Sequence, residues 1–257
     1  MPSAPLHNHR TSVGALGCLL LAAGAARADV PTPWAWLSVG GGAALTSDYI
    51  YRGVSESDGH GAAQADLHLS GSEGTFLGLW ASSRDSDLDP GAPAILDVYL
   101  GQRFELGTTW SATLAARSRY YLGASDYEPS ADYQELSAAF SYLDRWSVSF
   151  TAIPNAVRYW ELKRLSRAPA YVADASGQWL IGRHFFITGG AGYYYSTGTG
   201  SGIERATGYG YGNLGVAYEW RSWRLDVGYF VAQEAARRSF PYPIASSRGA
   251  ATLAWHF

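Results

Sequence analysis

Three side chains with the chemistry of a serine hydrolase alternate along one short segment. The run "DLHLS", residues 66–70, places Asp66, His68 and Ser70 on one face of an extended strand. A histidine can take the proton of a serine hydroxyl only within hydrogen-bonding distance, and residues two apart on a strand lie about 6.8 Å apart along the chain. No G-x-S-x-G or H-E-x-x-H motif accompanies the run. We therefore predict no catalytic residue and no enzyme.

A second polar segment, "TSDYIYRGVSESDG" at residues 46–59, is dense in charges and aromatic rings. If its first half is a strand, Asp48 and Arg52 share the inward face, while Tyr49 and Tyr51 face outward as part of an aromatic belt. The α-carbons of Asp48 and Arg52 are then about 13 Å apart. We expect each of these two side chains to find its partner on the second or the last strand of a sheet. Gly59 fits a turn that needs a positive φ angle.

The N-terminal residues have the pattern of an export signal. Polar and basic residues up to Arg10 precede an apolar run over residues 13–26, which ends in the small residues Ala26 and Ala28. A lipoprotein signal is disfavoured because the residues before Cys18 are in the wrong order. We expect a signal peptide at residues 1–28, cleaved near Ala28, and one mature domain at residues 29–257.

Metal-binding patterns are weak in this sequence. Asp85, Asp87 and Asp89 alternate as in part of a calcium loop, but the glutamate that ends such a loop is missing. A solvated acidic loop fits better, and it could bridge lipopolysaccharide through divalent ions. The single cysteine, Cys18, lies in the export segment, so the mature domain has no thiol ligand. We predict no metal site and no cofactor.

Composition points to the membrane and away from nucleic acid. The chain has 19 basic and 22 acidic residues, with a formal net charge of −3, and no basic block. Ten tryptophans, 18 tyrosines and 30 glycines accompany the export signal. An exported, aromatic-rich chain of this kind is typical of a β-barrel in the outer membrane of a Gram-negative bacterium.

Hydrophobic alternation predicts the fold class, which is all-β, a transmembrane antiparallel up-and-down β-barrel of twelve strands. In residues 96–104, for example, Leu96 and Leu100 lie on one face, and Asp97 and Arg103 on the other. Short turns alternate with long polar loops, as in bacterial barrels with their turns in the periplasm. The twelve expected strands are 38–51, 61–70, 75–83, 94–105, 108–122, 133–143, 146–158, 170–180, 184–196, 208–220, 223–233 and 247–257.

Aromatic residues gather near the ends of the expected strands, which predicts two belts at the two membrane interfaces. The expected turn-side belt consists of Trp34, Trp36, Trp110, Trp146, Trp220, Trp223 and Trp255, and the loop-side belt of Tyr49, Tyr51, Tyr120, Tyr121, Tyr159, Trp160, Tyr193, Tyr194 and Tyr195. The final run "ATLAWHF" alternates and ends in Phe257. It is similar to the C-terminal signal of outer membrane proteins, so we expect the barrel assembly machinery to recognise Phe257.

The first hairpin resembles a known family. "SDYIYRGVSESDG", followed by "GLWAS" and "DVYLG", is similar to the TorF-type porins, proteobacterial outer membrane proteins of about this length. The matching hairpin residues, expected at the barrel mouth, are Ser47, Asp48, Tyr49, Arg52, Gly53, Ser55, Asp58 and Gly59. Gly78, Trp80 and Ser82, and then Asp97, Tyr99 and Gly101, match on the next two strands. The resemblance covers the first third of the mature chain and implies an outer membrane barrel with a transport role.

The inward faces of the strands carry charges of both signs. We expect these lumen-facing candidates to be Asp66, His68, Asp97, Tyr99, Arg103, Arg117, Arg119, Glu135, Asp174, Arg224 and Asp226. They could line a narrow channel, or they could pair as internal salt bridges that only hold the barrel open. The sequence favours a narrow channel for passive passage of small solutes. A non-conducting barrel that binds a ligand or serves as a surface protein is the alternative, and a lipid-modifying enzyme is the third hypothesis.

Overall fold

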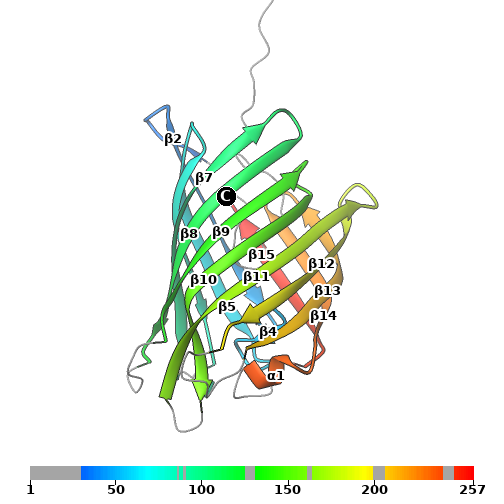
Figure 1. Cartoon of the computed structure of the whole chain (residues 1–257). Helices are drawn as coiled ribbons and strands as arrows, with labels where there is room; N and C mark the ends of the chain where they lie inside the picture. The colour runs from blue at the N-terminus through cyan, green and yellow to red at the C-terminus, as the bar shows by residue number, and fades with distance from the viewer. Residues whose placement is uncertain are drawn as a thin grey trace, which may run out of the picture.

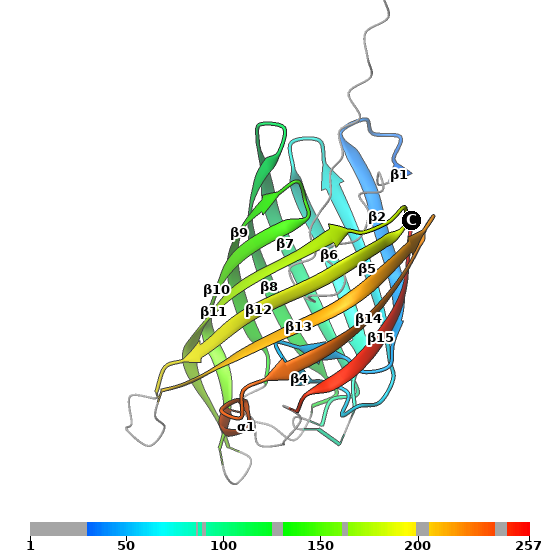
Figure 2. The same cartoon turned by 90° about the vertical axis from the view of Figure 1, so that its right-hand side faces the viewer.

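The computed structural model describes residues 30–85, 87–88, 91–124, 131–160, 164–198, 206–239 and 246–257. The expected signal peptide and parts of five long connections, including Asp89, lie outside these residues. The described chain forms a closed β-barrel whose strands are tilted relative to the barrel axis (Figures 1 and 2). Its twelve strands are β2 (Leu37–Thr46), β5 (Ala62–Gly71), β6 (Thr75–Ser83), β7 (Ala94–Leu106), β8 (Trp110–Leu122), β9 (Tyr133–Tyr142), β10 (Trp146–Trp160), β11 (Arg164–Leu180), β12 (Phe185–Ser196), β13 (Thr207–Trp220), β14 (Trp223–Ala232) and β15 (Arg248–His256).

Each strand pairs with its neighbour along the chain in antiparallel register, and β15 pairs with β2 to close the ring. The closing pairs run from Thr252–Thr46 to His256–Gly42. A short additional strand, β1 (Val30–Pro31), pairs with the part of β2 that extends beyond the C-terminal strand. The predicted twelve-stranded antiparallel barrel is therefore confirmed, and the strand limits differ from the expected ones mostly by one or two residues.

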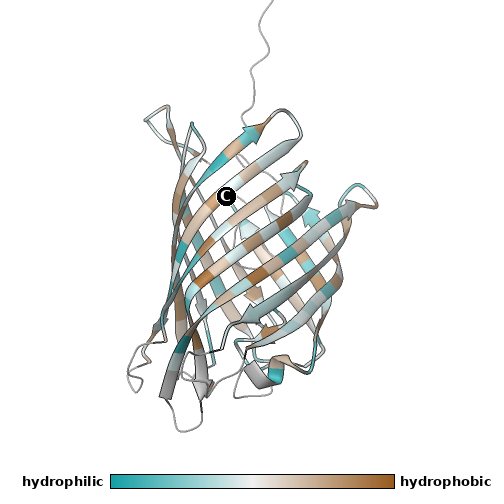
Figure 3. Ribbon diagram, viewed as in Figure 1, coloured by the Kyte–Doolittle hydropathy of each residue, from teal (hydrophilic) through white to brown (hydrophobic). Residues whose placement is uncertain are grey.

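Apolar and polar side chains separate between the two faces of the barrel. On β9, Leu136 and Phe140 are more than half exposed on the outer face, whereas Glu135 is buried inside. The seven tryptophans expected on the turn side are all exposed. Brown apolar segments accordingly spread along the strands in Figure 3. This outer face would be costly in water and suits contact with lipid.

The loop-side belt differs from the expectation. Tyr120, Tyr193 and Tyr195 are exposed, but Tyr49 and Tyr194 are buried inside the barrel. The side chains of two other expected members, Tyr159 and Trp160, lie outside the described residues.

The first predicted strand is wrong over residues 47–51. β2 ends at Thr46, and the chain then forms a separate two-stranded hairpin of β3 (Ile50–Tyr51) and β4 (Val54–Ser55). The two residues between these strands, Arg52 and Gly53, have φ angles of 52° and 77°. Two successive positive φ angles characterise a tight hairpin turn, which reverses the chain at this point.

Two further features depart from the predicted elements. A short helix, α1 (Ala236–Ser239), lies in the last long connection. The strand β11 starts six residues earlier than expected, after a register irregularity between Ile153 and Ala156 on β10. Pro154 lies within this irregularity, which fits the rule that proline within a sheet is confined to edges and bulges because it has no backbone N–H. Among the described residues, no helix is long and apolar enough to cross a membrane.

We predict that Leu136→Arg, on the outer face, lowers the free energy of unfolding in lipid by about 2–4 kcal/mol, the cost of a cation against hydrocarbon. Ser137→Arg is the matched control. Position 137 is next to Leu136 but faces the barrel interior, where the introduced guanidinium can reach water. Denaturant titrations in bilayers measure both values. Equal losses in the two variants would contradict this assignment of faces.

Candidate functional site

The hairpin β3–β4 folds inside the barrel at the end where the long loops gather (Figure 2). Asp48 anchors its base: the carboxylate accepts hydrogen bonds from Ser55 Oγ and Ser57 Oγ and pairs with Arg248 on β15 at 2.9 Å. Asp48 is only 4% exposed. The expectation that Asp48 finds its partner on the last strand is confirmed.

Other motif residues also support the base of the hairpin. Ser47 bonds β15 twice, because its N–H donates to the Ala251 carbonyl and its hydroxyl accepts from Ala251 N–H. Asp58 and Gly59 adopt φ angles of 50° and 80°, which turn the chain back towards β5. Ser47, Asp48 and Ser55 of the motif thus each hold the base of the hairpin by hydrogen bonds.

Arg52 anchors the hairpin tip on the far wall. Its guanidinium forms two parallel hydrogen bonds, of 2.9 and 3.1 Å, to the carboxylate of Glu135 on β9. The expectation that Arg52 pairs with the second or last strand is therefore wrong. Because the hairpin leaves the sheet, the side chain can cross the lumen to a strand that is far away in the ring.

Five alternating charges run from this tip along the wall. Glu135 also pairs with Arg117, which lies 3.3 Å from Asp97, and Asp97 forms two bonds of 2.8 Å with Arg119. All five side chains are at most 11% exposed. In a low-dielectric interior each of these charges needs such a partner, since an unpaired buried charge is strongly destabilising.

Aromatic rings of the hairpin cover this charge network. The Tyr51 ring lies 4.3 Å from the Arg119 guanidinium carbon, and the Tyr51 hydroxyl donates to Glu135 at 3.1 Å. Tyr49 packs on Trp80 of β6 with 5.4 Å between ring centroids. The two tyrosines predicted for the membrane belt therefore hold the hairpin to the inner wall, where cation–π contacts stabilise the arginines.

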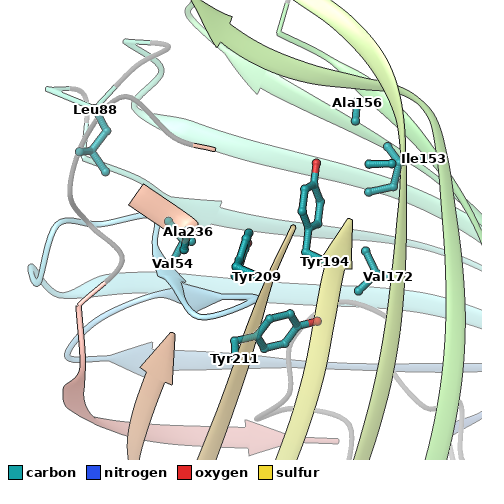
Figure 4. Close-up of a cluster of buried hydrophobic side chains, with 10 residues drawn as sticks. Val54, Leu88, Ile153, Ala156, Val172, Tyr194, Tyr209, Tyr211 and Ala236 are labelled. Atoms are coloured by element: carbon teal, nitrogen blue, oxygen red, sulfur yellow. The ribbon is translucent and has the colours of Figure 1, made fainter. Parts of the chain in front are cut away.

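An apolar cluster seals the loop side of the hairpin. Figure 4 shows Val54 of the hairpin, Leu88 of the second long loop and Ala236 of α1 beside inward side chains of the wall. The wall contributes Ile153, Ala156, Ala170, Val172, Tyr194, Tyr209 and Tyr211 to this cluster. A methyl group added to Gly53 would lie 2.6 Å from the Tyr211 Cβ atom, so the hairpin tip touches β13 directly.

The lumen on the turn side of the hairpin is more open. The side chains of Asp66 and His68 face inward but are 22% and 15% exposed. Three other inward side chains are also partly exposed, namely Ser137, Ser149 and Asp174. This accessible space, which we name the vestibule, is defined by these five residues. The described inward side chains at the level of the hairpin are mostly buried, whereas these five are partly accessible.

The candidate hydrolase residues form a pair rather than a triad. Asp66 bonds His68 Nδ1 at 2.7 Å and accepts a 2.6 Å hydrogen bond from the hydroxyl of Tyr99. Ser70 Oγ is buried and has no hydrogen-bond partner among the described residues, so it does not contact His68. A catalytic triad of Asp66, His68 and Ser70 is therefore not formed.

The remaining predicted residues, Asp174, Arg224, Asp226 and Arg103, each have a polar partner. Asp174 accepts a hydrogen bond from Tyr211, and Arg224 pairs with Asp226 at 2.7 Å and also with Glu219. Arg103 lies at the turn rim and bonds Glu105 and Asp144. Within the described part of the chain, no group of three or more His, Cys, Asp or Glu side chains could hold a metal ion.

Two contacts between loops were not predicted from the sequence. Arg84 pairs with Glu56 at 2.8 Å, and His60 Nδ1 lies 2.8 Å from an Asp85 oxygen. The hydrogen bond and the charge of Asp85 raise the pKa of the exposed His60 above its ordinary value of 6.5. No sequence pattern signals these contacts, because they join two loops whose proximity the barrel alone decides.

Comparison with protein families places the chain among known sequences. Residues 31–160, just over half of the chain and including the whole first hairpin, match the family described as bacterial protein of unknown function, Gcw_chp. The chain belongs to the Gcw_chp family. This description states no activity, and no curated protein sequence matches the chain.

Among solved structures, the NanC porin is similar in fold. It shares 10% sequence identity over 84% of this chain and 98% of its own, with a TM-score of 0.52. The KdgM porin, solved with disordered oligogalacturonate, shares 10% identity over 85% of this chain and 98% of its own, with a TM-score of 0.48. At such low identity, the NanC match supports the barrel fold of this Gcw_chp protein and nothing finer.

We predict that Glu135→Ala lowers the free energy of unfolding by about 3–5 kcal/mol, because Arg52 and Arg117 lose the carboxylate that they share. Denaturant titration in lipid measures the loss. Glu73→Ala, in an exposed turn, is the control and should change stability by less than about 0.5 kcal/mol. A Glu135→Ala loss as small as the control's would show that the network contributes little.

We also predict that the contact between His60 and Asp85 depends on pH. Since the pKa of His60 is raised, the charge-assisted contact is complete below pH 6.5 and is lost as the pH rises through the raised value. An NMR titration of His60 should show a pKa above 6.5 that falls towards 6.5 in Asp85→Asn but stays raised in Asp87→Asn. The same pKa in all three proteins would rule out the contact.

Proposed function

We propose that this Gcw_chp protein is an outer membrane channel, narrowed by its first hairpin, for passive passage of small solutes. The observation that carries the proposal is the hairpin itself, which crosses the lumen and bonds Glu135 on the far wall. The barrel also combines an apolar outer face with a partly accessible inner face. In lipid, a closed barrel satisfies all its strand hydrogen bonds and leaves its interior for polar groups.

The location follows from the same physical chemistry. Closed antiparallel barrels with apolar outer faces and aromatic girdles are outer membrane proteins of Gram-negative bacteria. The TorF-type resemblance of the first hairpin agrees with this location.

We further propose two partners. Lipopolysaccharide surrounds the loop end, and the barrel assembly machinery recognises the C-terminal strand through Phe257, which is 39% exposed.

A second function is favoured by a specific observation. The apolar cluster and the charge network seal the described lumen at the level of the hairpin, with Arg119 and Tyr209 fully buried. A barrel closed in this way could hold a ligand in the vestibule without conducting. The enzyme hypothesis has less support, because Ser70 does not contact His68.

Conductance across planar bilayers tests the proposal. We expect small unitary conductances from the purified protein and larger ones from Arg52→Ala, since the hairpin tip loses its two bonds to Glu135. Asp87→Asn, in an exposed loop, should conduct like the unchanged protein. If neither the unchanged protein nor Arg52→Ala conducts any ion, the channel is wrong and the ligand-binding barrel replaces it.

A further inference from the structure

Two carboxylates of the vestibule differ from every other inward charge. Asp66 is bonded only by the imidazole of His68 and the hydroxyl of Tyr99, and Asp174 only by the hydroxyl of Tyr211. In the described part of the chain, neither carboxylate forms an ion pair with an arginine. Both are partly exposed to the lumen, so their charge acts on the space through which a solute would pass.

The inward arginines of the described residues, in contrast, each pair directly with a carboxylate. Arg52 and Arg117 share Glu135, Arg119 has two bonds to Asp97, Arg224 pairs with Asp226, and Arg248 pairs with Asp48. The side chains of these arginines are at most 19% exposed. A paired and buried charge contributes less to the potential of the lumen than an exposed charge without a counter-ion.

A charge count over the same wall gives the same sign. Five arginines stand against seven carboxylates among the described side chains of the inner wall and the first hairpin. The arginines are Arg52, Arg117, Arg119, Arg224 and Arg248, and the carboxylates are Asp48, Asp66, Asp97, Glu135, Asp174, Glu219 and Asp226. The wall therefore carries an excess of negative charge.

The two arginine-free carboxylates lie opposite each other. Asp66 is on β5 and Asp174 on β11, and these strands are six apart in the closed ring of twelve. Asp66 lies five residues before the turn end of β5 at Gly71, and Asp174 six residues before the turn end of β11 at Leu180. A permeating ion therefore meets negative charge from both sides of the vestibule.

We propose that the channel selects cations, and that Asp66 and Asp174 are the residues that set this selectivity. The tyrosine hydroxyls hold each carboxylate on its own wall without neutralising it. Facing carboxylates in a low-dielectric wall raise the local concentration of cations and lower that of anions. This inference rests on the proposed channel function and names its solute class as small, positively charged solutes.

Reversal potentials in a KCl gradient test the inference. The measurement is made at pH 8. We expect the unchanged protein to pass K⁺ in preference to Cl⁻. In the double variant Asp66→Asn, Asp174→Asn, we expect the K⁺/Cl⁻ permeability ratio to fall by a factor of at least about three. Asparagine keeps the size of each side chain and can still accept from the tyrosine hydroxyls. Asp87→Asn removes the same charge from an exposed loop and should leave the ratio unchanged.

The outcomes separate the two proposals. A channel that prefers Cl⁻, or whose ratio is the same in the double variant, overturns cation selectivity and leaves the channel itself intact. Absence of any conductance overturns both. If the double variant does not form a heat-resistant barrel, each single variant is measured separately, and an unchanged ratio in both of them again overturns the inference.

Discussion

Closure of the sheet between β15 and β2 is the constraint on which the rest of this structure depends. A closed ring leaves no strand edge without hydrogen bonds, which is the condition for crossing lipid with strands. Closure also fixes the two faces: side chains such as Leu136 must meet lipid, and their neighbours such as Glu135 must turn inward. Because a fully buried inward charge is destabilising without a partner, the most buried part of the interior becomes a network of paired charges.

The first hairpin uses this interior as its binding surface. Its turn residues direct Arg52 towards Glu135, and its tyrosines cover the arginines of the wall. The charged and aromatic side chains of the hairpin occupy part of the lumen, which twelve strands alone would leave wider. One segment therefore narrows the barrel at its loop end, while the turn end keeps an accessible vestibule with Asp66 and Asp174 on opposite walls.

The difference in exposure between the hairpin level and the vestibule also explains which partner each inward carboxylate has. Bidentate arginine–carboxylate pairs concentrate where exposure is lowest, as with Arg119 and Asp97. Tyrosine hydroxyls are sufficient partners for carboxylates where water can reach, as with Tyr99 and Asp66. The cost of removing a charge from water thus sorts the partners along the axis of the barrel.

The sequence by itself determined the barrel, because alternation with a period of two is a local property and recurs in all twelve strands. It also determined which faces point inward, including those of Arg117 and Arg119. Only the tertiary structure decided the path of residues 47–59, the pairing of Arg52 with Glu135 and the burial of Tyr49. These contacts join residues more than 80 positions apart, or a loop to a wall, and neither periodicity nor spacing encodes which wall a hairpin will reach.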